Sequence, residues 1–208
     1  MPRTARNPVD TRRRLLEAAT RAIREKGFVA TSVDDICAAA GVSKGAFFHH
    51  FADKEALAIA AAEAFAARAA ELFDDPSLDA AATPRDRLFA YVALRKSMLD
   101  GEMADVTCLL GTMVQEVWET HPAIRDACAL GIGGHAGGLV DTIAAAKADH
   151  APGADWEPES VALHTQAVIQ GAFILAKAAG DTAVAVDSLS HLERYLKCLL
   201  PVAGSRGG

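Results

Sequence analysis

Apolar residues recur every three or four positions along most of the chain, the spacing that places side chains on one face of an α-helix. In the first third of the chain, this pattern predicts four helices, at about 10–26, 33–40, 44–50 and 54–75. We expect Asp10 to cap the first of them and Asp53 to cap the fourth, because a short polar side chain there can accept a backbone N–H.

The capping residues of the two short helices predict a helix-turn-helix motif. Ser32 is followed three positions later by Asp35, a variant of the capping box in which each side chain binds the other residue's N–H. Gly41 ends the helix at a turn that needs left-handed backbone geometry. Ser43 caps the next helix, and Phe47 is expected in the core. Two short helices joined by "AGVS" therefore form a helix-turn-helix.

The rest of the chain is also helical in pattern. It predicts five further helices, at about 84–99, 105–120, 122–149, 159–179 and 184–200. The whole chain is thus expected to be all-α, with about nine helices. In the last helix, leucines step by three and four and form an apolar stripe suited to a partner helix. Its members are Leu189, Leu192, Leu196 and Leu199.

Composition supports helices, and charge divides the chain. Of the 208 residues, 51% are hydrophobic, with alanine dominant and few aromatic or β-branched residues. The net charge is −6, yet residues 1–54 hold 10 Lys and Arg against 6 Asp and Glu. A basic front end on an acidic body is typical of a nucleic-acid-binding segment joined to another domain.

The remaining composition favours the cytoplasm. The four cysteines lie far apart without a C-x-x-C pair, which fits neither a disulfide framework nor a zinc site. No apolar run follows the basic N-terminus, so it is not a secretory signal. The most apolar stretch, residues 56–70, is interrupted by Glu63 and Arg68 and is not predicted to span a membrane.

Enzymatic, cofactor and metal chemistry find little support. "GIGGHA", residues 131–136, satisfies the dinucleotide-binding pattern, but a helical segment precedes it where a buried strand is needed. Its glycines are better explained by close helix packing or a bend. No catalytic set can be assembled from the scattered histidines. A metal sensor would need ligands without recognisable spacing, namely Cys108, His121, Cys128 and His135. We therefore predict no enzyme activity, cofactor or metal.

The segment "TSVDDICAAAGVSKGAFFHHFADKEAL" resembles the N-terminal helix-turn-helix of TetR-type transcriptional repressors. The turn glycine, "VSKG", the aromatic pair, "HF" and "KEAL" occur in the order and spacing of that family. The resemblance implies a DNA-binding domain at 9–69 and an effector-binding and dimerisation domain at 70–204. It also implies a homodimer that binds a palindromic operator and leaves it when a small molecule binds.

The resemblance implies a set of DNA contacts. Two residues depart from the family pattern: Phe48 replaces a common tyrosine, and Ala46 a common threonine. The start of the second helix, the end of the third and the start of the fourth would meet phosphate, while the start of the third helix would enter the major groove. The positions are Thr31, Ser32, Ser43, Lys44, Gly45, Ala46, Phe48, His49 and Lys54.

The C-terminal part offers candidate effector residues. An apolar pocket, or a plain core, is predicted around Phe89, Met98, Met103, Met113, Trp118 and Phe173. "TCLLGTMVQE" resembles a TetR subgroup with a "GCL…QE" sixth helix, with Thr107 in place of the glycine. Some members of that subgroup sense electrophiles or oxidants through a cysteine here, paired with a lysine that "ILAK" places at Lys177.

Cys108 is therefore predicted as a redox-sensing and ligand-lining residue, with Lys177 as its partner. The predicted helix starts near Asp105, so the dipole at its N-terminus favours the thiolate. Against this, Asp105 and Glu102 disfavour it, and a buried cysteine is usually only a small hydrophobe. The sequence as a whole predicts a cytoplasmic, ligand-responsive repressor. The rival is an all-α small-molecule-binding protein or enzyme whose helix-turn-helix is incidental, and activation instead of repression stays open.

Overall fold

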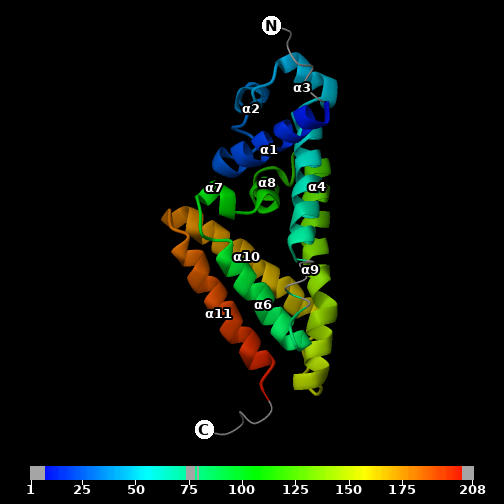
Figure 1. Ribbon diagram of the computed structural model, residues 1–208, viewed down its shortest axis with the longest axis vertical. Coiled ribbons are helices and arrows are strands. Elements are labelled where there is room, and N and C mark those ends of the chain that lie inside the picture. The colour runs from blue at the N-terminus through cyan, green and yellow to red at the C-terminus, as the bar shows by residue number, and fades with distance from the viewer. Residues whose placement is uncertain (1–7, 74–77, 79, 203–208) are drawn as a thin grey trace. The chain divides into compact units, whose positions relative to one another are not determined.

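The structure, a computed structural model, describes residues 8–73, 78 and 80–202. In this part of the chain it has ten α-helices and no strand, which confirms the all-α prediction (Figure 1). The chain divides into two compact units. The first consists of residues up to Arg68 together with Thr107–Gly131, and the second of Ala69–Val106 and the residues from Ile132 onward.

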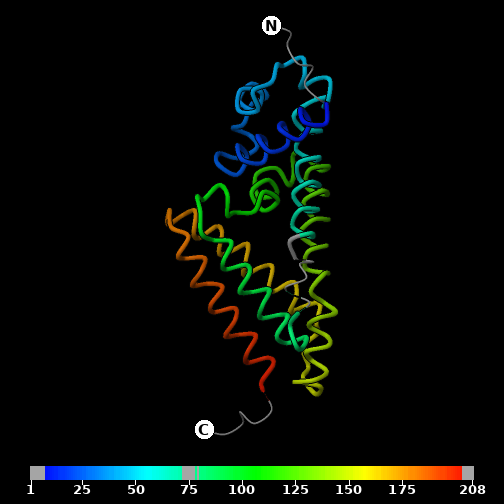
Figure 2. Tube along the Cα trace, viewed as in Figure 1, coloured from blue at the N-terminus to red at the C-terminus, as the bar shows by residue number. Residues whose placement is uncertain are grey.

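The first unit contains the predicted helix-turn-helix. Its helices are α1 (Pro8–Lys26), α2 (Val33–Ala40), α3 (Lys44–His50), most of α4 (Lys54–Phe73), α8 (Leu109–Val117) and the start of α9 (Pro122–His150). α1 packs against α2, α3 and α8, as the tube in Figure 2 traces. The core between them is apolar and fully buried at Leu15, Ile23, Ile36, Phe47 and Leu57.

The capping predictions around the turn are confirmed. The Ser32 hydroxyl accepts the Asp35 N–H at 3.1 Å, and the Asp35 carboxylate accepts the Ser32 N–H at 2.9 Å. Gly41 is left-handed, with φ 60° and ψ 41°. Its neighbourhood is tied to α1, because the Arg14 guanidinium donates to the carbonyls of Ala40 and Gly41. The turn between α2 and α3 is therefore held by the left-handed Gly41 that ends α2 and by Arg14 of α1.

Two predicted helix starts are wrong. α1 begins at Pro8, so Asp10 lies inside the helix and its carboxylate binds Arg13 instead of capping. The segment expected as one helix at 105–120 is split into α7 (Met103–Val106) and α8. The break arises because Cys108 has extended backbone geometry and starts α8 as its N-cap. By contrast Asp53 caps α4 as predicted, accepting the Ala56 N–H at 2.8 Å.

The second unit is built on α6 (Pro84–Ser97), α10 (Pro158–Ala179), α11 (Ala183–Leu199) and the later part of α9. α11 packs against both α10 and α6. By length and composition α10 could cross a membrane, but 44% of its apolar window is buried inside the protein. Core helices of water-soluble proteins pass the same test.

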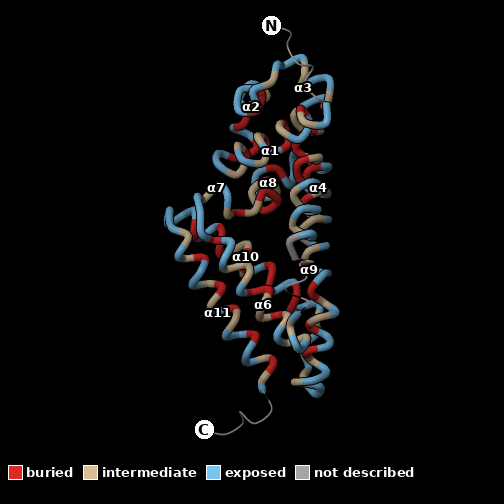
Figure 3. Tube along the Cα trace, in the orientation of Figure 1, coloured by how far each residue is buried: buried red, intermediate tan, exposed pale blue. Residues whose placement is uncertain are grey.

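The leucine stripe of α11 has a different role from the one predicted. Leu189, Leu192 and Leu196 are at most 2% exposed within a single chain, because they face the chain's own α10 and α6. Figure 3 shows buried positions alternating with exposed ones along α10 and α11. The stripe is therefore part of the core of the second unit, and the prediction that it meets a partner helix is wrong.

The glycine-rich segment lacks the strand–turn–helix setting of a dinucleotide-binding motif. Residues 131–136 lie within the continuous helix α9, with no strand before them in the described residues. A Cβ at Gly131 would lie 2.6 Å from Leu110 Cδ1 and 3.1 Å from the Ala66 Cβ, so close helix packing is confirmed there. At Gly133, Gly134, Gly137 and Gly138 there is open space for a side chain.

The two compact units differ from the contiguous domains 9–69 and 70–204 expected from the sequence. The first segment of the first unit ends at Arg68, and residues 107–131 group with the helix-turn-helix, so the expected domain bounds stay a prediction. The expected end of the second domain, residue 204, lies outside the described residues.

Candidate nucleic-acid interface and ligand-binding residues

Helix α3 exposes polar and aromatic side chains, and its N-cap and one buried ring fix its position. The Ser43 hydroxyl accepts the Ala46 N–H at 3.2 Å, which starts the helix. Phe47 is 0% exposed and anchors α3 in the core, whereas the next residue, Phe48, is 52% exposed. The two rings meet edge to face at 5.1 Å. The buried ring therefore fixes the position of an aromatic ring of which about half is exposed to solvent.

The residues around Phe48 can meet an anionic partner. Lys44, Gly45 and His49 are exposed. Lys44 Nζ lies 2.9 Å from a carboxylate oxygen of Asp34, and both side chains are more than half exposed. An exposed pair of this kind contributes about 0–1 kcal/mol, so phosphate can replace the carboxylate at little cost.

Thr31 and Lys54 organise the turn that leads from α1 into α2. Thr31 is 1% exposed, and its hydroxyl donates to the Gly27 carbonyl at 2.6 Å. Lys54 Nζ donates to the carbonyls of Phe28 and Thr31, each at 2.9 Å, and lies 4.2 Å from the centre of the Phe28 ring. Burial lowers the pKa of Lys54, and the carboxylate of Glu116 partly offsets that effect. The predicted phosphate contacts of both residues stay predictions.

A carboxylate from α8 completes this turn. Glu116 accepts the N–H of Phe28 at 2.5 Å and that of Val29 at 3.3 Å. The Phe28 ring also meets His121, just before α9, edge to face at 5.2 Å. Residues 107–131 are thus bonded directly to the helix-turn-helix, and sequence reasoning missed this role of Glu116. The "QE" that ends the α8 motif was the only signal for it.

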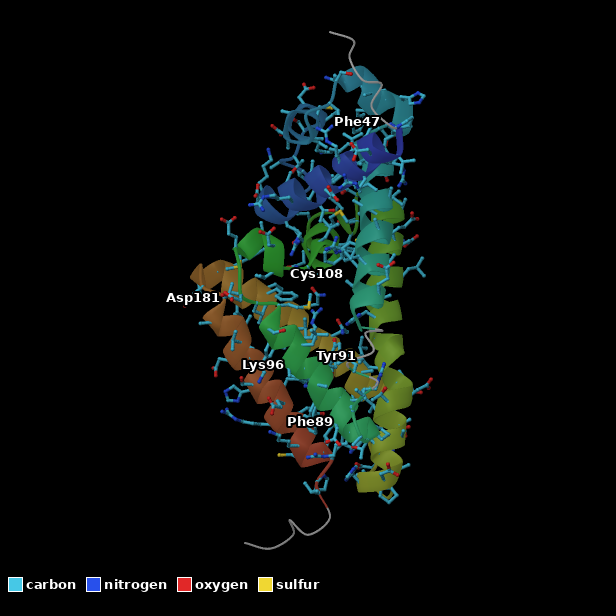
Figure 4. The ribbon with its side chains drawn as sticks, viewed as in Figure 1. Phe47, Phe89, Tyr91, Lys96, Cys108 and Asp181 are labelled. Atoms are coloured by element: carbon cyan, nitrogen blue, oxygen red, sulfur yellow. The ribbon has the colours of Figure 1, made fainter. Side chains whose placement is uncertain are left out.

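The predicted effector residues divide between the two units. Cys108, Met113 and Trp118 belong to the first, and Phe89, Met98, Met103, Phe173 and Lys177 to the second. Met113 is 0% and Phe173 8% exposed, but Trp118 is 57% and Met98 38% exposed. Lys177 is also exposed. Phe89, labelled in Figure 4, lies on α6, and the guanidinium carbon of Arg85 lies 4.5 Å from the centre of its ring.

Cys108 occupies the N-cap of α8 and is labelled in Figure 4. Its sulfur accepts the Gly111 N–H at 3.4 Å, so Cys108 precedes the first turn of α8 instead of lying within the first turn of a helix that starts near Asp105. Cys128 is fully buried; burial and, secondarily, the charge of a Cys108 thiolate raise the pKa of Cys128 to about 12. Cys128 is therefore a protonated, inert thiol at neutral pH, whereas Cys108 is half-buried.

Comparison with known proteins decides the family. A sequence model described as "Bacterial regulatory proteins, tetR family" matches residues 15–61. A second, described as "Tetracyclin repressor-like, C-terminal domain", matches residues 84–192, more than half of the chain. The chain belongs to the TetR family. Its helix-turn-helix is therefore that of a DNA-binding transcriptional regulator.

Individual relatives agree with this assignment. The chain is 34% identical over 121 residues to the HTH-type transcriptional repressor DhaR of Mycobacterium sp. strain GP1, and the match covers 58% of each chain. It therefore spans little more than half the length of that relative. The repressor NemR of Escherichia coli K12 is 24% identical over 187 residues, or 90% of this chain and 94% of NemR.

Solved structures share the fold. A TetR transcriptional regulator from Chloroflexus aurantiacus J-10-FL superimposes with a TM-score of 0.80 at 25% identity. The superposition covers 93% of this chain and 97% of that one.

Sequence reasoning missed a polar cluster inside the effector domain of this TetR-family chain. The Tyr91 hydroxyl of α6 lies 2.8 Å from His135 Nε2 of α9, and Gln166 of α10 donates to that hydroxyl at 3.3 Å. Tyr91 is 2% and Gln166 3% exposed. The three residues are 44 and 75 positions apart in sequence, so only the packing of the helices brings them together. The residues weighed as metal ligands do not converge: no such group of three exists among the described side chains.

Proposed function

We propose that this TetR-family chain is a ligand-responsive repressor that binds a palindromic operator as a homodimer in the cytoplasm. Helix α3 carries the proposal. Its N-cap and its buried Phe47 fix the backbone, and its exposed side chains, Lys44, Phe48 and His49, have no role in the core. The N-terminal residues of a recognition helix contact base edges in the major groove.

The homodimer would explain a second group of exposed apolar residues. On α10, Leu163, Ile174 and Leu175 are 60%, 47% and 55% exposed, and Gly171 has open space where a side chain would be. Leu163, Gly171 and Ile174 fall within one face of the helix by its period of 3.6 residues. Apolar residues on the outer face of a long helix are typical of a homodimer interface.

A two-fold dimer constrains the operator. Two copies of α3 can enter the same face of a duplex only when their half-sites lie about one helical turn, roughly 34 Å, or a multiple of it apart. Palindromic half-sites at that spacing are therefore the expected target. The relatives DhaR and NemR are named as transcriptional repressors, which favours repression for this chain.

The test is selection of bound sequences from random duplex DNA by the purified chain. We expect a palindrome, with an affinity for it that falls steeply with salt as phosphate-bound cations are released. Lys44→Ala should weaken binding about tenfold and alter the preferred bases, because a base contact is worth about 1–3 kcal/mol. Arg125→Ala, which removes another exposed cation from the first unit, is the charge-matched control.

An enrichment no better than random DNA would overturn the proposal. That result would favour the alternative function, an all-α ligand-binding protein or enzyme. If Lys44→Ala and Arg125→Ala weakened all sequences alike, the chain would bind DNA only through its charge, and specific recognition by α3 would be rejected.

Release by electrophiles through Cys108 is a second mode that one observation favours. The sulfur lies at the N-cap of α8 and accepts a backbone N–H there, so it is held at the positive end of the helix dipole. A quinone would add to it: the sulfur forms a C–S bond to a ring carbon, the thiol proton goes to one quinone oxygen, and the hydrogen of that ring carbon moves to the other oxygen, which gives a hydroquinone thioether. The pairing with Lys177 remains a prediction from family resemblance.

Cys198 complicates this test because it is exposed on α11. The experiment therefore uses a Cys198→Ser background and titrates operator complexes with p-benzoquinone. Operator release that tracks alkylation of Cys108, and is lost in Cys108→Ser, would support the sensor. DNA retained after complete alkylation of Cys108 would reject it.

A further inference from the structure

The cluster of Tyr91, His135 and Gln166 is not explained by stability. A hydrogen bond inside a protein contributes about 1 kcal/mol net, and well-packed apolar side chains would stabilise the same space equally well. The second unit nevertheless directs polar groups from α6, α9 and α10 to one point. Binding sites have this composition: mostly apolar walls with a few convergent polar groups that orient a ligand.

Arg95 adds a positive charge to the cluster. It lies one helical turn after Tyr91 on α6, with its guanidinium 5.7 Å from the centre of the Phe173 ring of α10. Its charge acts on both other titratable groups. Burial raises the pKa of Tyr91, and the charge of Arg95 partly offsets this effect. For His135, burial and, secondarily, the charge of Arg95 lower the pKa to about 4.

The cluster is therefore cationic at neutral pH and rich in donors. Tyr91 and His135 are uncharged there, so among these four residues Arg95 holds the only charge. The guanidinium, the phenol hydroxyl and the Gln166 amide all donate hydrogen bonds. A planar guanidinium binds a carboxylate through two parallel N–H···O bonds. Phe173, 8% exposed, offers an apolar ring beside that charge.

We propose that Tyr91, Arg95, His135 and Gln166 form the effector site, and that the effector is a small organic carboxylate whose apolar part packs on Phe173. The carboxylate binds Arg95 and receives a hydrogen bond from Tyr91 or Gln166. The residue that donates this bond gives up its present partner within the cluster. This inference rests on the proposed function, because it names the ligand class of the same repressor. It places the effector on helices α6, α9 and α10 of the second unit.

Paired ligands test the charge requirement on the wild-type protein. Benzoate, phenylacetate and hexanoate are compared with benzamide, phenylacetamide and hexanamide by isothermal titration calorimetry and by thermal shift. We expect at least one acid to bind and its amide to bind about tenfold or more weakly, because the amide cannot form the charge-assisted pair. Equal binding of acid and amide, or no binding by any acid, overturns the proposal.

Substitutions then locate the site. Arg95→Met keeps the apolar stem and should weaken the acid about tenfold or more, and Tyr91→Phe about three- to tenfold. The matched control is Arg85→Met, on the same helix and also stacked on a phenylalanine, which should change affinity less than about twofold. Arg95→Lys, which keeps the charge, covers the case in which Arg95→Met does not fold. Unchanged affinity in a folded Arg95 variant rejects the site.

Operator release is measured separately, so that the two proposals can fail independently. If the acid binds through Arg95 but operator DNA stays bound, the site stands and ligand-responsive repression fails. If a neutral compound releases the DNA equally from wild type and Arg95→Met, repression stands and the carboxylate site is wrong. Release by the acid from wild type, but not from Arg95→Met, supports both.

Discussion

The two units of this TetR-family chain place their chemistry in opposite environments. In the first unit, the candidate DNA contacts on α3 are exposed, and one buried ring, Phe47, holds them in position. In the second, the polar cluster around Tyr91 is buried among apolar residues. A surface that meets a large, charged polymer can use side chains in water, whereas a site for a small molecule must remove the molecule from water.

This difference changes how each unit responds to substitution. On α3, stability and DNA recognition depend on different residues, so they can be altered independently. In the second unit, Tyr91, Gln166 and Phe173 would contact an effector and are also core residues, so binding and stability are coupled there. Pairs of substitutions, one at a buried and one at an exposed position, measure how far stability and binding can be altered independently.

The largest effect is expected from a charge placed on the inner face of α11. Leu192→Glu buries an unpaired carboxylate and should cost about 4 kcal/mol or more of unfolding free energy. Ile174→Glu, on the exposed face of α10, should cost less than about 1 kcal/mol and instead yield monomers. Urea unfolding and light scattering separate the two outcomes. A folded Leu192→Glu monomer would show that the stripe is an interface after all.

The two adjacent phenylalanines of α3 provide the next contrast. Phe47→Ala should lose about 3–5 kcal/mol, because it empties a fully buried site. Phe48→Ala should leave unfolding nearly unchanged and weaken operator binding. Denaturant titration and DNA titration of both variants decide the point. Equal loss of stability in the two would contradict the separation of anchor and contact.

The bond between Glu116 and the 27–31 turn should have a moderate effect. Glu116→Ala removes the acceptor of the Phe28 and Val29 N–H groups and should cost about 1–3 kcal/mol. Amide hydrogen exchange at Phe28 and Val29 should accelerate in the variant. Glu119→Ala, an exposed glutamate in the turn after α8, is the control and should leave both rates unchanged. Unchanged exchange in Glu116→Ala would mean that the bond does not hold the turn.

The smallest effect concerns pH and Glu193 in α11. Hydrogen bonds from Lys197 and then Lys96 lower the pKa of Glu193 from 4.5 to about 2. A lowered carboxyl pKa contributes stability above the unfolded value, and that contribution is lost as pH falls from about 4.5 toward 2. Because the pair is partly exposed, Glu193→Gln should cost only about 1 kcal/mol at pH 7. The variant should also show a flatter acid limb in unfolding measured against pH.

The sequence alone determined the helix-turn-helix in detail. Ser32, Asp35, Gly41 and Ser43 act within three or four residues of their own helix ends, and so their roles could be read from spacing. Phe47 was predicted as a core residue, and it is fully buried. The all-α class followed in the same way from the period of apolar residues.

Only the tertiary structure decided which face of a helix meets what. The leucine stripe of α11 is apolar whether it packs on its own chain or on a partner, so the sequence could not distinguish the two. Asp10 could cap a helix or lie within it, because Pro8 offers an equally good start. Cys108 interrupts the predicted helix at a position where the sequence has no glycine or proline to mark the break.

The bond from Glu116 to Phe28 and the cluster of Tyr91, His135 and Gln166 join residues 44 to 88 positions apart. Local periodicity carries no information about such pairs, because a polar residue in a helix looks the same whether it faces water or a distant partner. The sequence thus determined the elements and their ends, and packing determined which polar groups were removed from water together.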